Sequence, residues 1–172
     1  MTRLVFVDTN ILVYAMQLDQ PIKQPIARQW LERLWSTRSG RTSVQVLNEY
    51  YNTITRKIRP VKAPDEAWAR VERYLSWEPQ PIDTTVLKQA RDIERRFKIS
   101  WWDSLIVAAA QAQNCGLLLT EDLQDRAAYG GVTVCNPFVL GVSELAAEYA
   151  APPARERPYR PRGRPKGAKR AV

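Results

Sequence analysis

Near its N-terminus the chain contains Leu4-Val5-Phe6-Val7-Asp8-Thr9-Asn10, in which four apolar residues lead directly into three polar ones. A short, continuous apolar run is typical of a strand that is buried on both faces of a parallel sheet. The polar residues stand where that strand should end, and in open α/β sheets ligands bind at this carboxyl end. The alternative is that Asp8 or Thr9 only caps the helix that follows.

Further along the chain, apolar segments alternate with helically spaced apolar residues. Residues 117–119 and 132–134 predict two more buried strands, and prolines limit residues 80–82 to a short edge strand. Gly116 stands where a left-handed residue would end the helix before these strands. This alternation indicates an α/β fold, a three-layer domain with a central parallel sheet flanked by helices. The helical spacing covers, in chain order, 23–37, 44–57, a segment from Pro64, 84–98 and 101–114.

The positive charge of the chain is concentrated at its C-terminus. Residues 151–172 contain eight Lys or Arg and one Glu, which accounts for +7 of the net charge of +8. This segment has no aliphatic side chain larger than Ala before Val172, so it cannot bury enough apolar surface to fold alone. The 172 residues therefore predict one domain over 1–140, a further helix over 141–150 and a disordered basic tail over 151–172.

Several kinds of protein are excluded by what the chain lacks. It contains no histidine, which rules out Ser-His-Asp triads, histidine acid–base pairs and histidine-ligated zinc. No stretch approaches the roughly 18 uncharged apolar residues of a membrane span, and the N-terminus lacks a signal-peptide layout. Cys115 and Cys135 form no C-x-x-C pair and are expected to be small buried hydrophobes in a reducing cytoplasm. Hydrolytic chemistry would therefore depend on carboxylates, hydroxyls, lysines or a hard metal ion.

Asp103 is the carboxylate that a structural role explains least. At helical spacing its neighbours include Ile99, Ile106 and Val107, which predicts that it lies in the apolar stripe of the most buried helix. A charge there is costly unless it is paired or bound to a cation. The helix dipole at the first turn would offset only about 0.3–1 kcal/mol of that cost. A cap alone is therefore a poor explanation for this residue.

For two further carboxylates, Glu49 and Asp122, a functional and a structural role are both open. Glu49 lies within a predicted helix, where a solvated face is the alternative. Asp122 follows the predicted strand over 117–119, and its alternative is an ordinary turn aspartate. Glu121 and Asp125 compete with Asp122 for the functional role.

The two strands that precede Asp8 and Asp122 would bring these carboxylates together if they were parallel neighbours. Several anions at one sheet edge would raise one another's pKa unless a cation lay among them. Oxygen-only ligands suit Mg²⁺ or Mn²⁺ rather than zinc. Such a metal can lower the pKa of bound water and hold a phosphate oxygen, which would replace the absent histidine. The residues alone thus indicate a metal-dependent phosphodiesterase, and their spacing does not separate it from a phosphatase.

Four segments carry these carboxylates and their neighbours. They are Val7-Asp8-Thr9-Asn10-Ile11-Leu12, Ser43-Val44-Gln45-Val46-Leu47-Asn48-Glu49-Tyr50, Trp102-Asp103-Ser104-Leu105-Ile106-Val107-Ala108-Ala109-Ala110 and Leu118-Leu119-Thr120-Glu121-Asp122-Leu123. With these segments, in this order, the chain resembles a PIN domain over about residues 3–138, and specifically the VapC-type toxins of toxin–antitoxin pairs. The resemblance implies a metal-dependent endoribonuclease with a parallel sheet of four or five strands. It also implies a homodimer and inhibition by a cognate antitoxin that inserts into the active-site groove.

Residue by residue, the resemblance implies that the family's acidic quartet is Asp8, Glu49, Asp103 and Asp122. Asp8 and Asp103 would be the principal ligands of Mg²⁺ or Mn²⁺, with Glu49 and Asp122 completing the site directly or through water. The implied substrate is RNA, with tRNA or ribosomal RNA foremost, although the residues themselves do not distinguish RNA from DNA or exclude a DNase. The auxiliary polar positions that match the family are Thr9, Thr120 and Asp125.

The tail contains a motif of its own. Residues 160–166, Arg-Pro-Arg-Gly-Arg-Pro-Lys, resemble an AT-hook, whose Arg-Gly-Arg-Pro core lies in the minor groove of A·T-rich DNA. One alternative is a tail that binds any polyanion through counterion release. Another is that the whole protein is a DNA- or RNA-binding regulatory module. The expected contacts are Arg160, Arg162, Gly163, Arg164 and Lys166.

Overall fold

The computed structural model describes residues 3–139. The predicted helix over 141–150 and the tail with its AT-hook-like motif lie outside the described residues. Strand β1 (Val5–Val7) is the N-terminal apolar run, and all three of its residues are buried. It lies between β2 (Gly40–Arg41) and β3 (Leu117–Leu119), and both run parallel to it. The first predicted strand and the strand over 117–119 are therefore parallel neighbours.

The sheet in the described part of the chain has five strands in the order β2-β1-β3-β5-β4. β5 (Val132–Cys135) is parallel to β3, whereas β4 (Ala128–Tyr129) pairs with β5 in the antiparallel direction. The predicted α/β fold with a central sheet of four or five strands is confirmed. The sequence did not predict β4, because a two-residue strand with one exposed side chain has no readable apolar pattern.

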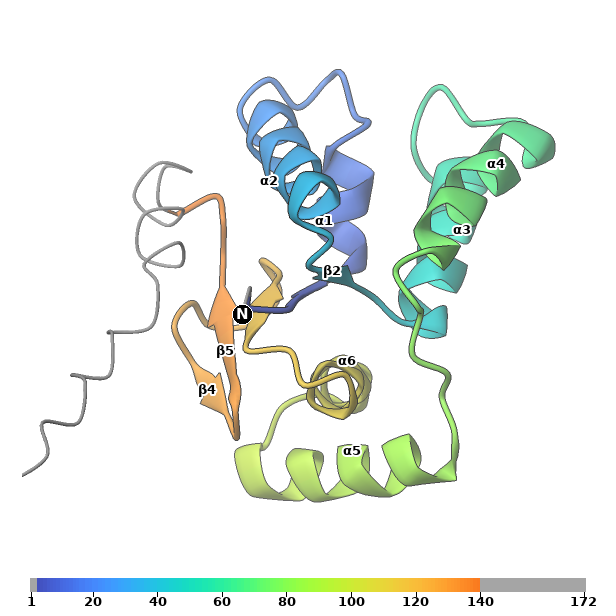
Figure 1. Ribbon diagram of the computed structural model, residues 1–172. Helices are drawn as coiled ribbons and strands as arrows, with labels where there is room; N and C mark the ends of the chain where they lie inside the picture. The colour runs from blue at the N-terminus through green and yellow to red at the C-terminus, as the bar shows by residue number, and fades with distance from the viewer. Residues whose placement is uncertain (1–2, 140–172) are drawn as a thin grey trace, which may run out of the picture.

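Six helices surround the strands of residues 3–139. Figure 1 shows them in three pairs, with the strands between the first pair and the third. The predicted helices over 23–37, 44–57 and 84–98 are found to within one residue. The pairs are α1 (Thr9–Tyr14) with α2 (Lys23–Thr37), α3 (Val44–Arg56) with α4 (Pro64–Leu75), and α5 (Thr84–Phe97) with α6 (Trp101–Ala112).

The end of α6 differs from the prediction. The helix stops at Ala112, and the residue in the left-handed conformation is Asn114, with φ of 55°, rather than Gly116. Asparagine tolerates this conformation better than most side chains, so no glycine is required there. Gly116 instead lies beside the side chain of Arg3, where an added Cβ would come within 2.0 Å of Nε. Because the Arg3 side chain is exposed and flexible, it can move aside, so neither packing nor backbone conformation requires a glycine at this position.

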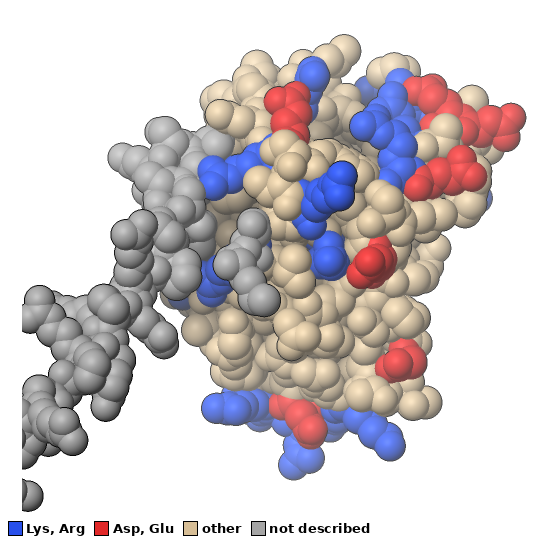
Figure 2. All heavy atoms as spheres, viewed as in Figure 1, with Lys and Arg blue, Asp and Glu red and all other residues tan. Residues whose placement is uncertain are grey.

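The surface of the described residues shows basic side chains gathered at the bottom of the molecule, where α5 lies (Figure 2). The basic residues of α5 that are exposed are Lys88, Arg91, Arg95 and Arg96.

No helix in the described part of the chain is long and apolar enough to cross a membrane.

Replacing Gly40 with Ala should destabilise the fold by about 1–3 kcal/mol, because overpacking a filled interior displaces side chains or backbone. A Cβ added at Gly40 would lie 2.6 Å from two ring atoms of Trp77. That ring is only 3% exposed and packs against Trp35 and Tyr74. Urea unfolding measures the difference, and Gly131→Ala is the matched control, since a Cβ there meets no atom within 4 Å. Equal unfolding free energies for the two variants would contradict the prediction.

Candidate active site

Asp8 lies at the junction of β1 and α1 and has two roles. It is the N-cap of α1, because its Oδ1 accepts a hydrogen bond from the backbone N–H of Thr9 at 2.6 Å. Its Oδ2 accepts a hydrogen bond from the Thr120 hydroxyl at 2.7 Å, and the residue is buried. The capping role that the sequence left open is therefore real. It does not exclude a functional role, because the same carboxylate also lines a groove.

This groove, of about 590 Å³, lies at the carboxyl ends of β1 and β3. The topology explains its composition. The parallel pairing of β1 with β3 puts the residues that follow the two strands at one edge of the sheet, and α3 and α6 contribute the other walls. The structure thus brings the four predicted carboxylates into one place. The lining residues are Asp8, Gln45, Asn48, Glu49, Ile82, Trp102, Asp103, Ile106 and Asp122.

Thr120 connects the residues that follow the two strands. Its buried hydroxyl donates to Asp8 and accepts from the backbone N–H of Asp122 and from Nδ2 of Asn10, both at 3.1 Å. Nδ2 of Asn10 also donates to Oδ2 of Asp122 at 2.9 Å. Sequence reasoning missed Asn10 as a site residue, although its place directly after Asp8 and Thr9 was the available signal.

Glu49 is held on the exposed side of the groove by two donors. The Thr9 hydroxyl and Nε2 of Gln45 each donate to one of its carboxylate oxygens at 3.1 Å. Gln45 and Glu49 are four residues apart on α3, whose start is fixed by the Ser43 cap, so their side chains lie on the same helix face. Gln45 is a second residue that the sequence reasoning did not select.

Asp103 does not lie where the sequence predicted. The prediction that it belongs to the apolar stripe of α6 is wrong, because the helix is buried from Ser104 to Ala110 and its first turn extends into the groove. Asp103 is half-buried there, and its Oδ2 accepts a hydrogen bond from the Ser100 hydroxyl at 2.6 Å. Ser100 in turn caps α6 by accepting from the backbone N–H of Asp103 at 3.1 Å.

The two competing carboxylates, Glu121 and Asp125, do not line the groove. Glu121 forms an ion pair with Lys23 at 2.6 Å and accepts a short hydrogen bond from the Tyr14 hydroxyl. Asp125 accepts a hydrogen bond from the backbone N–H of Asn136 at 2.8 Å and so holds the chain after β5. The structure therefore separates Asp125 from the four groove carboxylates.

The electrostatics of the groove are unfavourable for a carboxylate without a cation. Burial is the largest effect and raises the pKa of Asp8 to about 7, against the opposing hydrogen bonds from Thr120 and the backbone of Thr9. The negative charges of Asp122 and Glu49 raise the pKa of Asp8 further. A bound cation would remove this penalty.

The donor set fits a hard divalent cation. Every candidate ligand is an oxygen, and Oδ1 of Asn10 is buried without a hydrogen-bond partner. Within residues 3–139, no three Cys, Asp or Glu side chains lie close enough to hold a metal ion in this geometry. Glu49, Asp103 and Asp122 instead accept hydrogen bonds from neighbouring side chains. None of these three side chains is buried.

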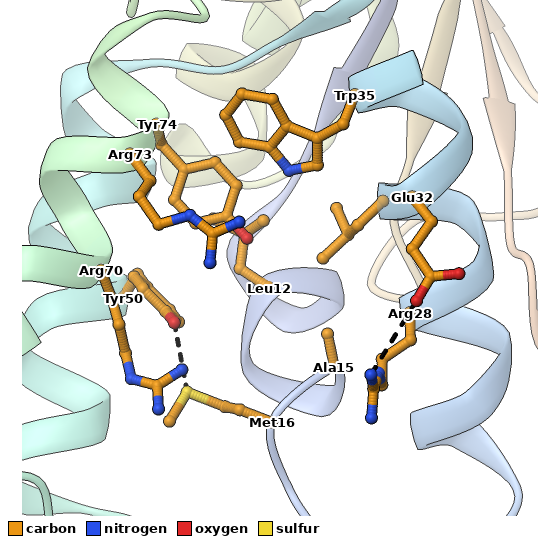
Figure 3. Close-up of a pocket in the computed structure, with 11 residues that line it drawn as sticks. Leu12, Ala15, Met16, Arg28, Glu32, Trp35, Tyr50, Arg70, Arg73 and Tyr74 are labelled. Carbon is orange, nitrogen blue, oxygen red and sulfur yellow. Dashed lines mark hydrogen bonds and ion pairs between the residues drawn. The ribbon is translucent and has the colours of Figure 1, made fainter. Parts of the chain in front are cut away.

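A second pocket, of about 180 Å³, lies between α2 and the pair α3–α4 and has different chemistry. Figure 3 shows Arg70 and Arg73 of α4 pointing into it, with Trp35, Tyr50 and Tyr74 around them. Its one lining carboxylate, Glu32, lies 3.9 Å from Arg28. A basic and aromatic pocket of this kind does not attract a divalent cation, which leaves the carboxylate groove as the candidate site.

Comparisons with known proteins agree on the fold. A family model described as PIN domain matches residues 5–129, and no curated protein matches the sequence significantly. A chain of the FitAB complex bound to a DNA fragment has a TM-score of 0.61 and 20% identity, covering 80% of this chain and 97% of that one. A toxin–antitoxin complex from Klebsiella pneumoniae has a TM-score of 0.50 and 18% identity, covering 77% and 97%. VapC20 of Mycobacterium tuberculosis, a toxin that cleaves the sarcin–ricin loop, has a TM-score of 0.49 and 19% identity, covering 69% and 91%.

Proposed function

The chain belongs to the PIN-domain family, as its four segments predicted, and on that premise we propose that it is a metal-dependent endoribonuclease and the toxin of a toxin–antitoxin pair. The observation that carries the proposal is the groove at the carboxyl ends of β1 and β3. There the buried Asp8, whose pKa is raised to about 7, shares the lining with three other carboxylates from distant parts of the chain, Glu49, Asp103 and Asp122. Such an arrangement is suited to holding a cation against a phosphodiester.

In this proposal Asp8 and Asp103 are the principal ligands of Mg²⁺ or Mn²⁺, and Glu49 and Asp122 complete the site directly or through water. The metal, when bound, would lower the pKa of a water molecule and stabilise negative charge on the phosphate oxygens. Thr120 and Asn10 position the carboxylates that follow β1 and β3 through their hydrogen bonds to Asp8 and Asp122. No histidine is needed for this chemistry.

The partners follow from the same proposal. The structural neighbours include FitAB and a toxin–antitoxin complex from Klebsiella pneumoniae, which supports a cognate antitoxin as a partner. RNA as the substrate, tRNA or ribosomal RNA foremost, and a homodimer are proposed on the resemblance to VapC-type toxins. The basic tail, with Arg162 and Arg164 in its AT-hook-like core, is proposed to add affinity for nucleic acid.

The deciding experiment incubates purified protein with tRNA and ribosomal RNA in Mg²⁺ and compares the wild type with Asp103→Asn. We expect discrete fragments from the wild type, at least about a hundredfold less cleavage by the variant, and no cleavage in EDTA. Asp125→Asn is the matched control, because the Asp125 carboxylate lies outside the groove. This variant should cleave RNA as the wild type does. Equal cleavage by Asp103→Asn would contradict the assignment. Release of phosphate from a monoester without RNA cleavage would identify a phosphatase instead.

A further inference from the structure

We propose that Trp102 stacks on one unpaired base of the substrate and seats it beside the carboxylates. The inference rests on the proposed nuclease function and deepens it by assigning a base contact to one residue of this chain. Trp102 precedes Asp103 directly and lines the same groove. Its side chain is 64% exposed, more than that of any other tryptophan among residues 3–139.

The exposure of Trp102 is not a by-product of a loose helix end. The preceding residue, Trp101, is partly buried against the core, and the Ser100 cap fixes the first turn of α6. A tryptophan left largely in water forgoes the stabilisation that burial of its ring would give. A rigid aromatic face that remains exposed beside charged groups is thus available to a ligand.

The rest of the groove matches the two parts of a nucleotide. Trp102 and Ile106 are four residues apart on α6 and share its groove-facing side, and Ile82, 39% exposed, adds a further apolar lining. These apolar side chains lie in the same groove as the carboxylates. A nucleotide bound there could place its base on the apolar side chains and its phosphate near the carboxylates. Asn48, on α3, also lines the groove, and its side chain is exposed. An amide of this kind can donate to and accept from the edge of a base.

The base that contacts Trp102, Ile106 and Ile82 in this proposal is an unpaired base rather than a paired one. In a duplex, each base is covered on both faces by its neighbours, so no face is open to an indole ring. A single strand offers such a face at every nucleotide, whatever its sequence. A phosphate monoester without a base would make no use of Trp102.

The test measures binding and cleavage separately with a short single-stranded RNA that carries a fluorescent label. Fluorescence anisotropy in Ca²⁺, which also takes oxygen ligands, gives the Kd while a gel checks that the strand stays intact, and initial rates in Mg²⁺ give kcat and KM. We compare Trp102→Leu, which keeps apolar bulk without an aromatic ring, with Trp102→Phe, which keeps a ring. Trp68→Leu is the matched control, because Trp68 is 51% exposed but lines a different groove, between α3 and α4, whose lining shares only Asn48 with the carboxylate groove.

We expect Trp102→Leu to raise the Kd and the KM for single-stranded RNA about tenfold with little change in kcat, since stacking on one base contributes to binding. Trp102→Phe should restore most of the affinity, and Trp68→Leu should bind as the wild type does. The duplex of the same sequence should bind Trp102→Leu and the wild type equally.

Equal affinity of the wild type and Trp102→Leu for the single strand would overturn the proposal. Equal losses of RNA affinity in Trp102→Leu and Trp102→Phe, with both variants melting at the wild-type temperature, would also overturn it. So would a result in which the substitutions weaken binding of a partner protein and leave RNA binding unchanged. The outcome is separable from that of the nuclease proposal. If RNA binding depends on the aromatic ring at position 102 but no RNA is cleaved, the stacking proposal holds and the nuclease proposal fails. If RNA is cleaved but neither binding nor cleavage depends on the ring, the nuclease proposal holds and the stacking proposal fails.

Discussion

Replacing Asp8 with Asn should lower RNA cleavage by at least about a thousandfold while leaving the protein folded. The amide keeps the shape of the side chain and its oxygen can still accept a hydrogen bond from Thr120 or the backbone of Thr9. It removes the charge at the deepest of the groove carboxylates, the one that is 7% exposed. Loss of cation binding and loss of cleavage should therefore occur together. A variant that retains more than about a tenth of the wild-type rate would show that Asp8 is not required for the chemistry.

The same substitution should raise the melting temperature of the metal-free protein. Burial raises the pKa of Asp8 from 3.8 in its ordinary state to about 7 in the fold. The folded chain therefore binds one more proton than the unfolded chain between these two values, and its stability should fall as the pH rises through that range. Asp8→Asn should lack this part of the pH dependence. Mg²⁺ should raise the melting temperature of the wild type but not that of the variant, because only a ligand that binds the folded state stabilises it.

Thr120→Val should cost about 2 kcal/mol of unfolding free energy, because the buried hydroxyl makes a charge-assisted hydrogen bond and accepts two more. Valine has nearly the same shape, so the loss reflects hydrogen bonds and not a cavity. It leaves Asp8 without its side-chain donor and the backbone N–H of Asp122 without its acceptor. Cleavage should fall about a hundredfold as the carboxylates lose their alignment.

Urea unfolding and initial cleavage rates measure the two effects of Thr120→Val. Thr42→Val is the control, because Thr42 is also fully buried but donates only one hydrogen bond, of 3.3 Å, to the carbonyl of Val7. It should lose about 1 kcal/mol or less and cleave normally. If Thr120→Val cleaved as fast as Thr42→Val, the hydroxyl would be a purely structural group.

The sequence predicted the fold well where burial is continuous. β1 and β3 are apolar runs without interruption, which predicted both strands, whereas their pairing as parallel neighbours was only a condition in the sequence analysis and came from the structure. The sequence-based prediction failed at β4, because a strand of two residues is too short to show a pattern. It also failed at Asp103, because helical periodicity placed this residue on a buried face, whereas the first turn of α6 extends past the edge of the sheet. Periodicity describes a helix by itself and does not say which of its turns the sheet covers.

The candidate site was only partly predictable for a different reason. The carboxylates were visible because charges next to apolar segments are unusual, whereas Asn10 and Gln45 are ordinary polar residues in the sequence. Their importance arises from hydrogen bonds to Asp122 and Glu49, and the first of these spans 112 residues of chain. Contacts of this range depend on the strand order, which the sequence of one chain does not display.

The pairing of β1 with β3 also has a consequence for biosynthesis. A ribosome that has released the first 116 residues has already exposed Asp8, Glu49 and Asp103, but neither Thr120 nor Asp122. At that stage one edge of β1 lacks the neighbour with which Val5–Val7 later align. The groove is complete only after the last central strands have emerged and inserted beside it. Strand order therefore sets the stage of synthesis at which the four groove carboxylates can come together, and this stage follows the emergence of β3.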